Sequence, residues 1–192
     1  MDPAQTQTIR QDARSRLELT ESEKLLVVPG RMVRGGGHRT ALWARGMLCL
    51  IDPDIHIALP VGGPMLTHVR HFARHSSIDG RGLLPESCLP LEDMLQAADV
   101  AVIIPSVSIA VSIPTLLDAG RAGLPIVAAD LPEVRRLYAD GRDALLVEPG
   151  SARAAAAAIL RILDDTDLAD KLGRNARQTA LDREANACPP TC

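Results

Sequence analysis

Residues 99–130 have the sequence DVAVIIPSVSIAVSIPTLLDAGRAGLPIVAAD, and this stretch decides the fold. Two short runs rich in β-branched residues, Val100–Ile104 and Ile126–Ala129, are bounded by turn residues and predict buried strands. Ser112 and Pro114 suit the start of a helix between them. Apolar residues of that helix recur at i, i+3, i+4 and i+7, namely Ile113, Leu116, Leu117 and Gly120. The stretch is therefore a strand–helix–strand unit with parallel strands.

The carboxyl ends of such strands are the expected place for a ligand. In this unit they lead into the loop 106–112 and the helix start at Ser112. Asp118 falls at the edge of the buried helix face, where a carboxylate could accept hydrogen bonds from a pair of sugar hydroxyls. The alternative for Asp118 is an ordinary solvated helix residue.

The rest of the chain continues the alternation of strands and helices. Further strands are expected at Leu25–Val28, Ile55–Leu59, Gly82–Leu84 and Ala144–Val147. The other predicted helices are Ile9–Leu19, Arg39–Leu50, one ending near His75, Leu91–Ala97, one ending at Gly141, Ala152–Leu163 and Leu168–Leu181. We predict an α/β fold with three layers, a Rossmann-like doubly wound parallel sheet of about six strands. The expected organisation is a leader with a possible helix (1–22), one domain (23–183) and a flexible tail (184–192).

Composition excludes several classes of function. The 192 residues are 46% hydrophobic and only 2% aromatic, which suits Leu/Ile/Val/Ala strands covered by helices and disfavours base-stacking nucleic-acid binders. The formal charge of −3 gives no general attraction for nucleic acid. The sequence shows neither a signal peptide nor an apolar stretch long enough to span a bilayer, so a cytoplasmic protein is expected.

A basic glycine-rich loop, PGRMVRGGGHRT, follows the first predicted strand. Gly35, Gly36 and Gly37 lie among Arg31, Arg34 and Arg39 and just before a helix, an arrangement that suits a diphosphate. The loop matches neither the P-loop nor the dinucleotide fingerprint, which disfavours a nicotinamide enzyme, and an exposed turn is the alternative.

Two groups of residues raise the question of a metal. His68, His71 and His75 recur near one face of a helix, and Cys188 and Cys192 are close together at the end of the chain. No carboxylate or cysteine ligand is obvious beside the histidines, and no second cysteine pair lies near CPPTC. A polar basic helix face and a frayed tail are therefore expected, with no metal.

Several motifs resemble one family of bacterial sugar-nucleotide enzymes. PGRMVR, VGGP, LEDMLQAADVAVIIPS and LLDAGRAGLPIVAADLPEVRRLYADGRDALLVEPGS occur in the order and spacing of the carboxyl-terminal domain of the retaining GT-B glycosyltransferases, group 1 or family four type. The likeness runs from about Asp12 to Leu181. It implies half of a GT-B architecture, in which this domain binds the nucleotide sugar and a separate domain binds the acceptor.

The resemblance also implies roles for single residues. Arg31 matches the family arginine that holds the donor diphosphate, whereas the family lysine five residues later is Gly36 here. Arg34, His38 and Arg39 are candidate substitutes for the lysine. Of the two family glutamates, the ribose-binding one falls on Asp118 and the one near the transferred sugar on Ala110.

The expected donor-binding residues are Arg31, Arg34, Gly35, Gly36, Gly63, Ser112 and Asp118, and no catalytic residue is assigned.

The resemblance implies the donor-binding half of a hexosyltransferase that acts in carbohydrate biosynthesis with retention of configuration and without a cofactor. Because half of a cleft enzyme cannot orient two substrates, the isolated chain is expected to be inactive and to need an acceptor-binding domain or chain. The alternative is a degenerate, non-catalytic GT-B domain that serves as a protein-interaction module.

Overall fold

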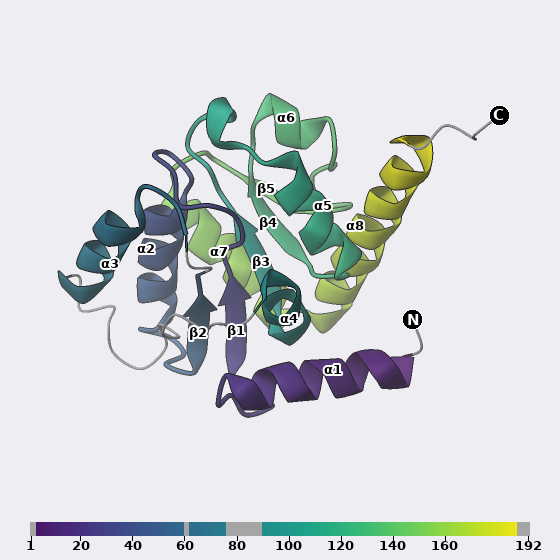
Figure 1. Ribbon diagram of the computed structural model, residues 1–192, viewed down its shortest axis with the longest axis horizontal. Helices are drawn as coiled ribbons and strands as arrows, with labels where there is room; N and C mark the ends of the chain where they lie inside the picture. The colour runs from purple at the N-terminus through teal and green to yellow at the C-terminus, as the bar shows by residue number, and fades with distance from the viewer. Residues whose placement is uncertain (1–2, 60–61, 76–89, 188–192) are drawn as a thin grey trace.

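A five-stranded parallel sheet forms the centre of the computed structural model, which describes residues 3–59, 62–75 and 90–187 (Figure 1). The strands are β1 (Lys24–Val27), β2 (Ile55–Ala58), β3 (Val100–Ile103), β4 (Ile126–Ala129) and β5 (Leu145–Val147), in the order β2-β1-β3-β4-β5. The prediction of a parallel α/β sheet is confirmed, with five strands rather than about six. The strand expected at 82–84 lies outside the described residues.

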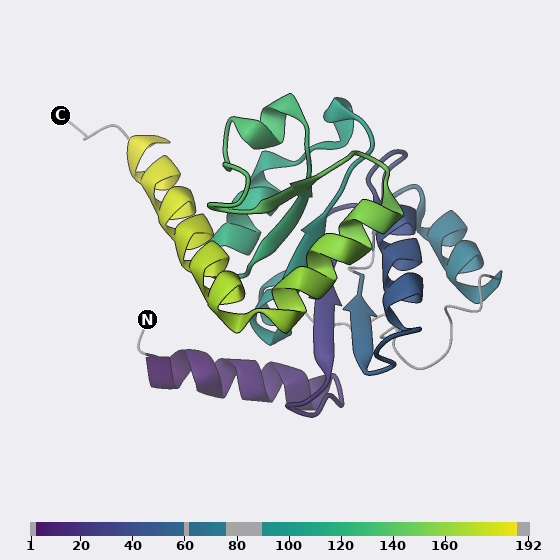
Figure 2. The same cartoon turned by 180° about the vertical axis from the view of Figure 1, so that it is seen from behind.

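Helices cover both faces of the sheet, which confirms the three layers. They are α1 (Pro3–Arg16), α2 (His38–Leu48), α3 (Leu66–His75), α4 (Leu91–Ala97), α5 (Ile113–Arg121), α6 (Pro132–Arg135), α7 (Ala152–Asp164) and α8 (Thr166–Ala187), with a short 3-10 helix η1 (Ser108–Ala110). Figure 2 shows α7 crossing the face that it shares with α2 and α3. The helix α8 includes residues 184–187, which the sequence placed in a tail.

The strands alternate their side chains between two apolar cores, as parallel strands covered on both faces must. On β3, Val100 and Val102 pack with α2 and α7, whereas Ala101 and Ile103 pack with α4 and α5. All four of these residues are buried, with at most 6% exposure. An uninterrupted apolar run in the sequence is therefore a strand buried on both sides.

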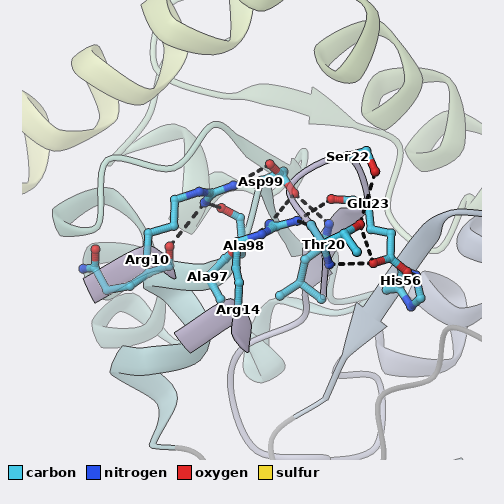
Figure 3. Close-up of polar contacts among 11 residues, drawn as sticks. Arg10, Arg14, Thr20, Ser22, Glu23, His56, Ala97, Ala98 and Asp99 are labelled. Carbon is cyan, nitrogen blue, oxygen red and sulfur yellow. Dashed lines mark hydrogen bonds and ion pairs between the residues drawn. The ribbon is translucent and has the colours of Figure 1, made fainter. Parts of the chain in front are cut away.

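Helix α1 is fixed beneath the amino ends of the strands by a polar network (Figure 3). The Asp99 carboxylate accepts hydrogen bonds from the Leu25 N–H at 2.7 Å, from Arg10 at 2.7 Å and from Arg14 at 3.3 Å. The buried Arg14 guanidinium also donates to the Ala97 carbonyl at 2.9 Å. These bonds attach α1 to the start of both β1 and β3, so the helix belongs to the same folded unit as the sheet.

The order of the strands places a topological switch point between β1 and β3. From β1 the chain crosses to β2 on one side, whereas from β3 it crosses to β4 on the other. The loops after β1 and β3 therefore separate at the carboxyl edge of the sheet, where open α/β sheets bind ligands. Among the described helices, none combines the length and apolar character needed to cross a membrane.

Candidate functional site

The glycine loop after β1 packs directly on the chain that follows β3. Gly37 has a φ of 86°, and a Cβ there would lie 2.2 Å from the Ile104 carbonyl oxygen. Gly35 has a φ of 76°, and a Cβ there would lie 2.7 Å from Val107 Cγ2. The Ser106 N–H donates to the Gly35 carbonyl at 2.8 Å. Only glycine allows this combination of left-handed backbone and close approach.

The loop after β2 joins the same edge. The Met32 N–H donates to the Gly62 carbonyl, and the Met65 N–H donates to the Met32 carbonyl, both at 2.9 Å. Gly63 has a φ of 114°, and a Cβ there would lie 2.5 Å from the Met32 carbonyl oxygen. Three loops from neighbouring strands are thus held together mainly by backbone atoms.

The glycine loop leads straight into the amino end of α2, where backbone N–H groups are available. Gly37 is the N-cap residue and no side chain caps the helix there. The Ala41 N–H donates to the Gly37 carbonyl at 2.9 Å as the first bond of the helix, so the N–H groups of residues 38–40 have no acceptor within it. Such a helix start favours a bound anion.

A pocket of about 540 Å³ opens at this helix start. Its walls come from the glycine loop and α2, including Arg34, Arg39 and Trp43, and from Met65 and His68 across the pocket. The side chains of Arg34 and Arg39 are exposed. Residues 31–51 and 62–75, which supply most of these walls, contain no Asp or Glu. The pocket therefore has a positive surface beside free backbone N–H groups.

Arg31 and Arg34 both project from this loop as exposed side chains. Within residues 3–59, 62–75 and 90–187, neither of them has an ion-pair partner. Arg34 lines the pocket, whereas Arg31 precedes it next to Met32. Both guanidinium groups are thus available for an anionic ligand.

His38 is buried in the loop rather than presented to the pocket as a cation. Its Nε2 lies 3.2 Å from the Gly30 carbonyl oxygen, and its Nδ1 has no hydrogen-bond partner among the described residues. Burial lowers the pKa of the imidazole, which is therefore neutral near pH 7. A Cβ at Gly36 would lie 3.1 Å from the Val33 carbonyl oxygen and 3.3 Å from His38 Nδ1, so a longer residue needs a local shift.

Ser112 caps α5, as the sequence predicted. Its hydroxyl oxygen accepts from the Thr115 N–H at 3.4 Å and lies 2.8 Å from the Thr115 hydroxyl. The Thr115 side chain lies 3.6 Å from the position of a Cβ on Gly30. The start of α5 is therefore next to the glycine loop.

Asp118 lies apart from the pocket at the glycine loop. Its carboxylate forms an ion pair with Arg121, which also pairs with Glu184 of α8. Asp118 lines a different depression of about 450 Å³, together with Leu91 and Glu92 of α4. The structure thus brings Arg34, Gly35, Gly36 and the turn at Gly63 to one edge with Ser112 close by, but leaves Asp118 on another surface.

Trp43 and Met65 also line the pocket, and the sequence did not single them out. Trp43 lies on the outward face of α2, and the apolar periodicity of a helix indicates only which face is buried. Met65 follows a glycine turn, which carries no signal for a ligand. The one signal was composition, because Trp43 is the single tryptophan of the chain. Among the described residues, no group of three His, Cys, Asp or Glu side chains could hold a metal ion.

Comparison with known proteins gives consistent matches. The family described as "Glycosyl transferases group 1" matches residues 9–179. D-inositol 3-phosphate glycosyltransferase of Paenarthrobacter aurescens (strain TC1) is 27% identical over 178 residues, covering 89% of this chain and 43% of that protein.

Solved structures of glycosyltransferases share the fold. HepE from Anabaena, in complex with UDP and glucose, matches 95% of this chain and 49% of its own with a TM-score of 0.72 and 16% identity. The carboxyl-terminal domain of LpcC, a group 1 glycosyl transferase from Francisella tularensis, matches 93% of this chain and 97% of its own with a TM-score of 0.73 and 16% identity. Sucrose-phosphate synthase from Thermosynechococcus elongatus matches 90% of this chain and 44% of its own, with a TM-score of 0.72 and 24% identity.

The chain spans less than half the length of its curated relative and about half that of HepE. Its match to a separately solved carboxyl-terminal domain shows which half of the GT-B architecture this fold corresponds to. Since the family match covers most of the sequence, the chain belongs to the group 1 glycosyl transferases and has the fold of their carboxyl-terminal domain.

Proposed function

We propose that this chain binds a nucleoside-diphosphate sugar at the pocket of the glycine loop and provides the donor-binding half of a retaining glycosyltransferase. The observation that carries the proposal is the uncapped start of α2 beside Arg34 in a pocket wall that lacks acids. Backbone N–H groups and guanidinium groups together suit the two charges of a diphosphate. No metal or other cofactor is assigned to this step.

The comparisons support this class of donor. HepE was solved with UDP and glucose and with UDP-glucose, and it shares the fold over 95% of this chain. In our proposal Arg31 and Arg34 hold the diphosphate, while Gly35, Gly36 and Gly63 let the backbone approach it. Ser112 shapes the neighbouring helix start, and Asp118 reaches the ribose only if its ion pair with Arg121 opens.

An acceptor-binding half is part of the proposal because the edge beside the pocket exposes apolar side chains. Val107, Ile109 and Ile113 are 44%, 96% and 39% exposed, and Val107 touches the glycine loop. Exposed apolar residues grouped beside a ligand pocket suit a second domain or chain that closes over it. Without that partner the chain would bind donor but lack the orientation needed for transfer.

One observation favours the alternative of a non-catalytic interaction domain. Gly36 and Ala110 replace two residues expected from the family resemblance, and Asp118 is engaged by Arg121 on a surface away from the pocket. A domain that no longer binds nucleotide would show this combination. The two proposals differ in nucleotide binding, which can be measured directly.

Isothermal titration of the chain with UDP, GDP and UDP-glucose tests the donor site. We expect micromolar to millimolar binding that Arg34→Gln weakens roughly 10- to 100-fold, the loss of one charge-assisted hydrogen bond of about 1.5–3 kcal/mol. Arg174→Gln is the matched control because Arg174 is an exposed arginine on α8. Loss of binding in both variants would indicate a general effect of charge rather than a site.

Asp118→Asn in the same titration tests the ribose contact. Weaker binding would mean that the carboxylate leaves Arg121 to reach the nucleotide, whereas unchanged binding would remove Asp118 from the site. The absence of heat with every nucleotide, together with no change in thermal unfolding, would refute donor binding and favour the interaction domain.

A further inference from the structure

We propose that the outer surface of α2 and α3 is a docking surface for an anionic lipid bilayer. The surface, here called the α2–α3 face, consists of an apolar stripe on α2 and the turn after it, together with the exposed basic side of α3. It lies at the β2 edge of the molecule, where α3 is the outermost helix (Figure 1).

The apolar stripe covers the carboxyl-terminal half of α2 and the turn that follows it, on the side away from the core. Trp43, Met47, Leu50 and Ile51 are 50%, 40%, 89% and 67% exposed. Trp43 and Met47 are four residues apart and so lie on one side of α2, and Leu50 and Ile51 lie in the turn directly after its last residue, Leu48. The opposite side of α2 packs against the core, where Ala41, Ala44 and Leu48 are buried. The stripe is therefore not needed for the fold.

The exposed ionisable side chains around this stripe are basic. Residues 31–51 and 62–75 contain no acidic residue, although the whole chain has a net charge of −3, and their exposed arginines are Arg31, Arg34, Arg39 and Arg74. On α3, Arg74 is accompanied by three exposed imidazoles, those of His68, His71 and His75. Asp52 and Asp54 follow the stripe at its far end, and the Asp54 N–H donates to the Asp52 carboxylate. The basic character is thus a property of this face rather than of the protein.

Aromatic contacts join the apolar and basic parts into one surface. Trp43 and Phe72 meet edge to face, with ring centroids 5.5 Å apart. The Arg39 guanidinium lies 4.9 Å from the centre of the Phe72 ring, so it is held beside the stripe. Arg39 and Trp43 also line the pocket of the glycine loop, which therefore opens next to the proposed docking surface.

The combination of groups favours a bilayer over other partners. Tryptophan prefers the boundary between headgroups and acyl chains, aliphatic side chains enter that boundary, and arginine pairs with anionic headgroups. A nucleic-acid surface would satisfy the arginines but leave Leu50 and Ile51 in water. An anionic membrane accommodates both the apolar stripe, in the acyl-chain boundary, and the arginines, at the charged headgroups. This binding does not depend on a nucleotide.

Trp43 provides a direct test, because it is the only tryptophan. The chain is mixed with vesicles of phosphatidylcholine alone or of equal parts phosphatidylcholine and phosphatidylglycerol, and tryptophan emission and co-sedimentation are recorded. We expect a blue shift, protection from iodide quenching and co-sedimentation with the anionic vesicles only. High salt should weaken binding because it screens the arginines.

Matched variants separate the apolar and the charged contributions. Leu50→Gln removes an exposed side chain of the stripe and keeps the Trp43 reporter, whereas Leu181→Gln changes an exposed leucine, 44% accessible, on α8. Arg74→Gln should lower partitioning into anionic vesicles about five-fold, the factor that corresponds to ~1 kcal/mol per arginine at such a surface. Arg174→Gln on α8 should leave partitioning unchanged.

Several results would overturn the proposal. They are no shift of the tryptophan emission with anionic vesicles, equal losses of vesicle binding in the α8 control variants, an emission blue shift that grows with protein concentration without lipid, or an emission shift produced by RNA but not by vesicles. The third would assign the α2–α3 face to a second copy of the chain, and the fourth to nucleic acid.

Discussion

Replacing Gly37 by alanine should destabilise the protein and displace the glycine loop. The left-handed φ of 86° costs an alanine ~1–2 kcal/mol. Its Cβ would also lie 2.2 Å from the Ile104 oxygen and 2.5 Å from the Ile104 carbonyl carbon, both backbone atoms of the residue that follows β3. Forcing atoms into so packed a region adds about 1–3 kcal/mol, so Gly37→Ala should lower the free energy of unfolding by about 2–5 kcal/mol.

Urea denaturation of Gly37→Ala beside Gly141→Ala isolates the steric part. Gly141 has a φ of 68°, but a Cβ there would meet nothing within 4 Å, so this variant carries only the backbone cost. The difference in unfolding free energy between the two variants measures how tightly the loop packs on the chain that follows β3. If Gly37→Ala is no less stable than Gly141→Ala, the close approach of these two segments is wrong, and so is the pocket built on it.

Three further predictions concern the fold around the sheet. Tyr138→Phe should cost about 1 kcal/mol of unfolding free energy in urea, because the buried hydroxyl donates to the Leu116 carbonyl at 2.9 Å. Asp99→Asn should cost about 3 kcal/mol in the same assay, since it leaves the buried Arg14 guanidinium without its carboxylate. Asp93→Asn, at the exposed ion pair with Arg16, should cost at most about 1 kcal/mol. Equal losses in the two variants would show that burial does not strengthen the Asp99 ion pair. Hydrogen bonds from Thr20 hold the pKa of Glu23 below its usual value of 4.5, so this stabilisation is complete above pH 4.5 and is lost as the pH falls through the lower folded pKa. The unfolding midpoint followed against pH should therefore depend less on pH in Glu23→Gln than in the parent chain.

The sequence predicted the buried strands well because their signal is local. Val100–Ile104 and Ile126–Ala129 are short apolar runs between turn residues, and the observed β3 and β4 differ from them by at most one residue. Leu91–Ala97 was predicted with its observed bounds. Helix α8 is longer than expected because its polar last turns carry no apolar periodicity, and DREANA continues the helix through residues with little hydrophobic signal.

The candidate site was predictable only in part. The glycine loop was predicted because glycines and arginines directly before a helix are neighbours in sequence and together suit an anionic ligand. The direction of the Asp118 side chain depends on its ion pair with Arg121. Arg121 in turn pairs with Glu184, which is 63 residues away in sequence from Arg121. The wall formed by Met65 and Trp43 depended on how α3 packs against α2. Contacts between distant segments leave no periodic trace in a single sequence.

The edge of the sheet that carries the glycine loop is held by main-chain contacts, and this has a consequence for how the domain can change. Gly35, Gly37 and Gly63 set the shape of the pocket through carbonyl and amide groups, not through the side chains that face its opening. Exposed residues such as Arg34 and Arg39 can therefore be exchanged without rebuilding the frame. A laboratory seeking altered ligand preference could randomise those exposed positions while keeping the three glycines, and the frame would tolerate many of the resulting chains.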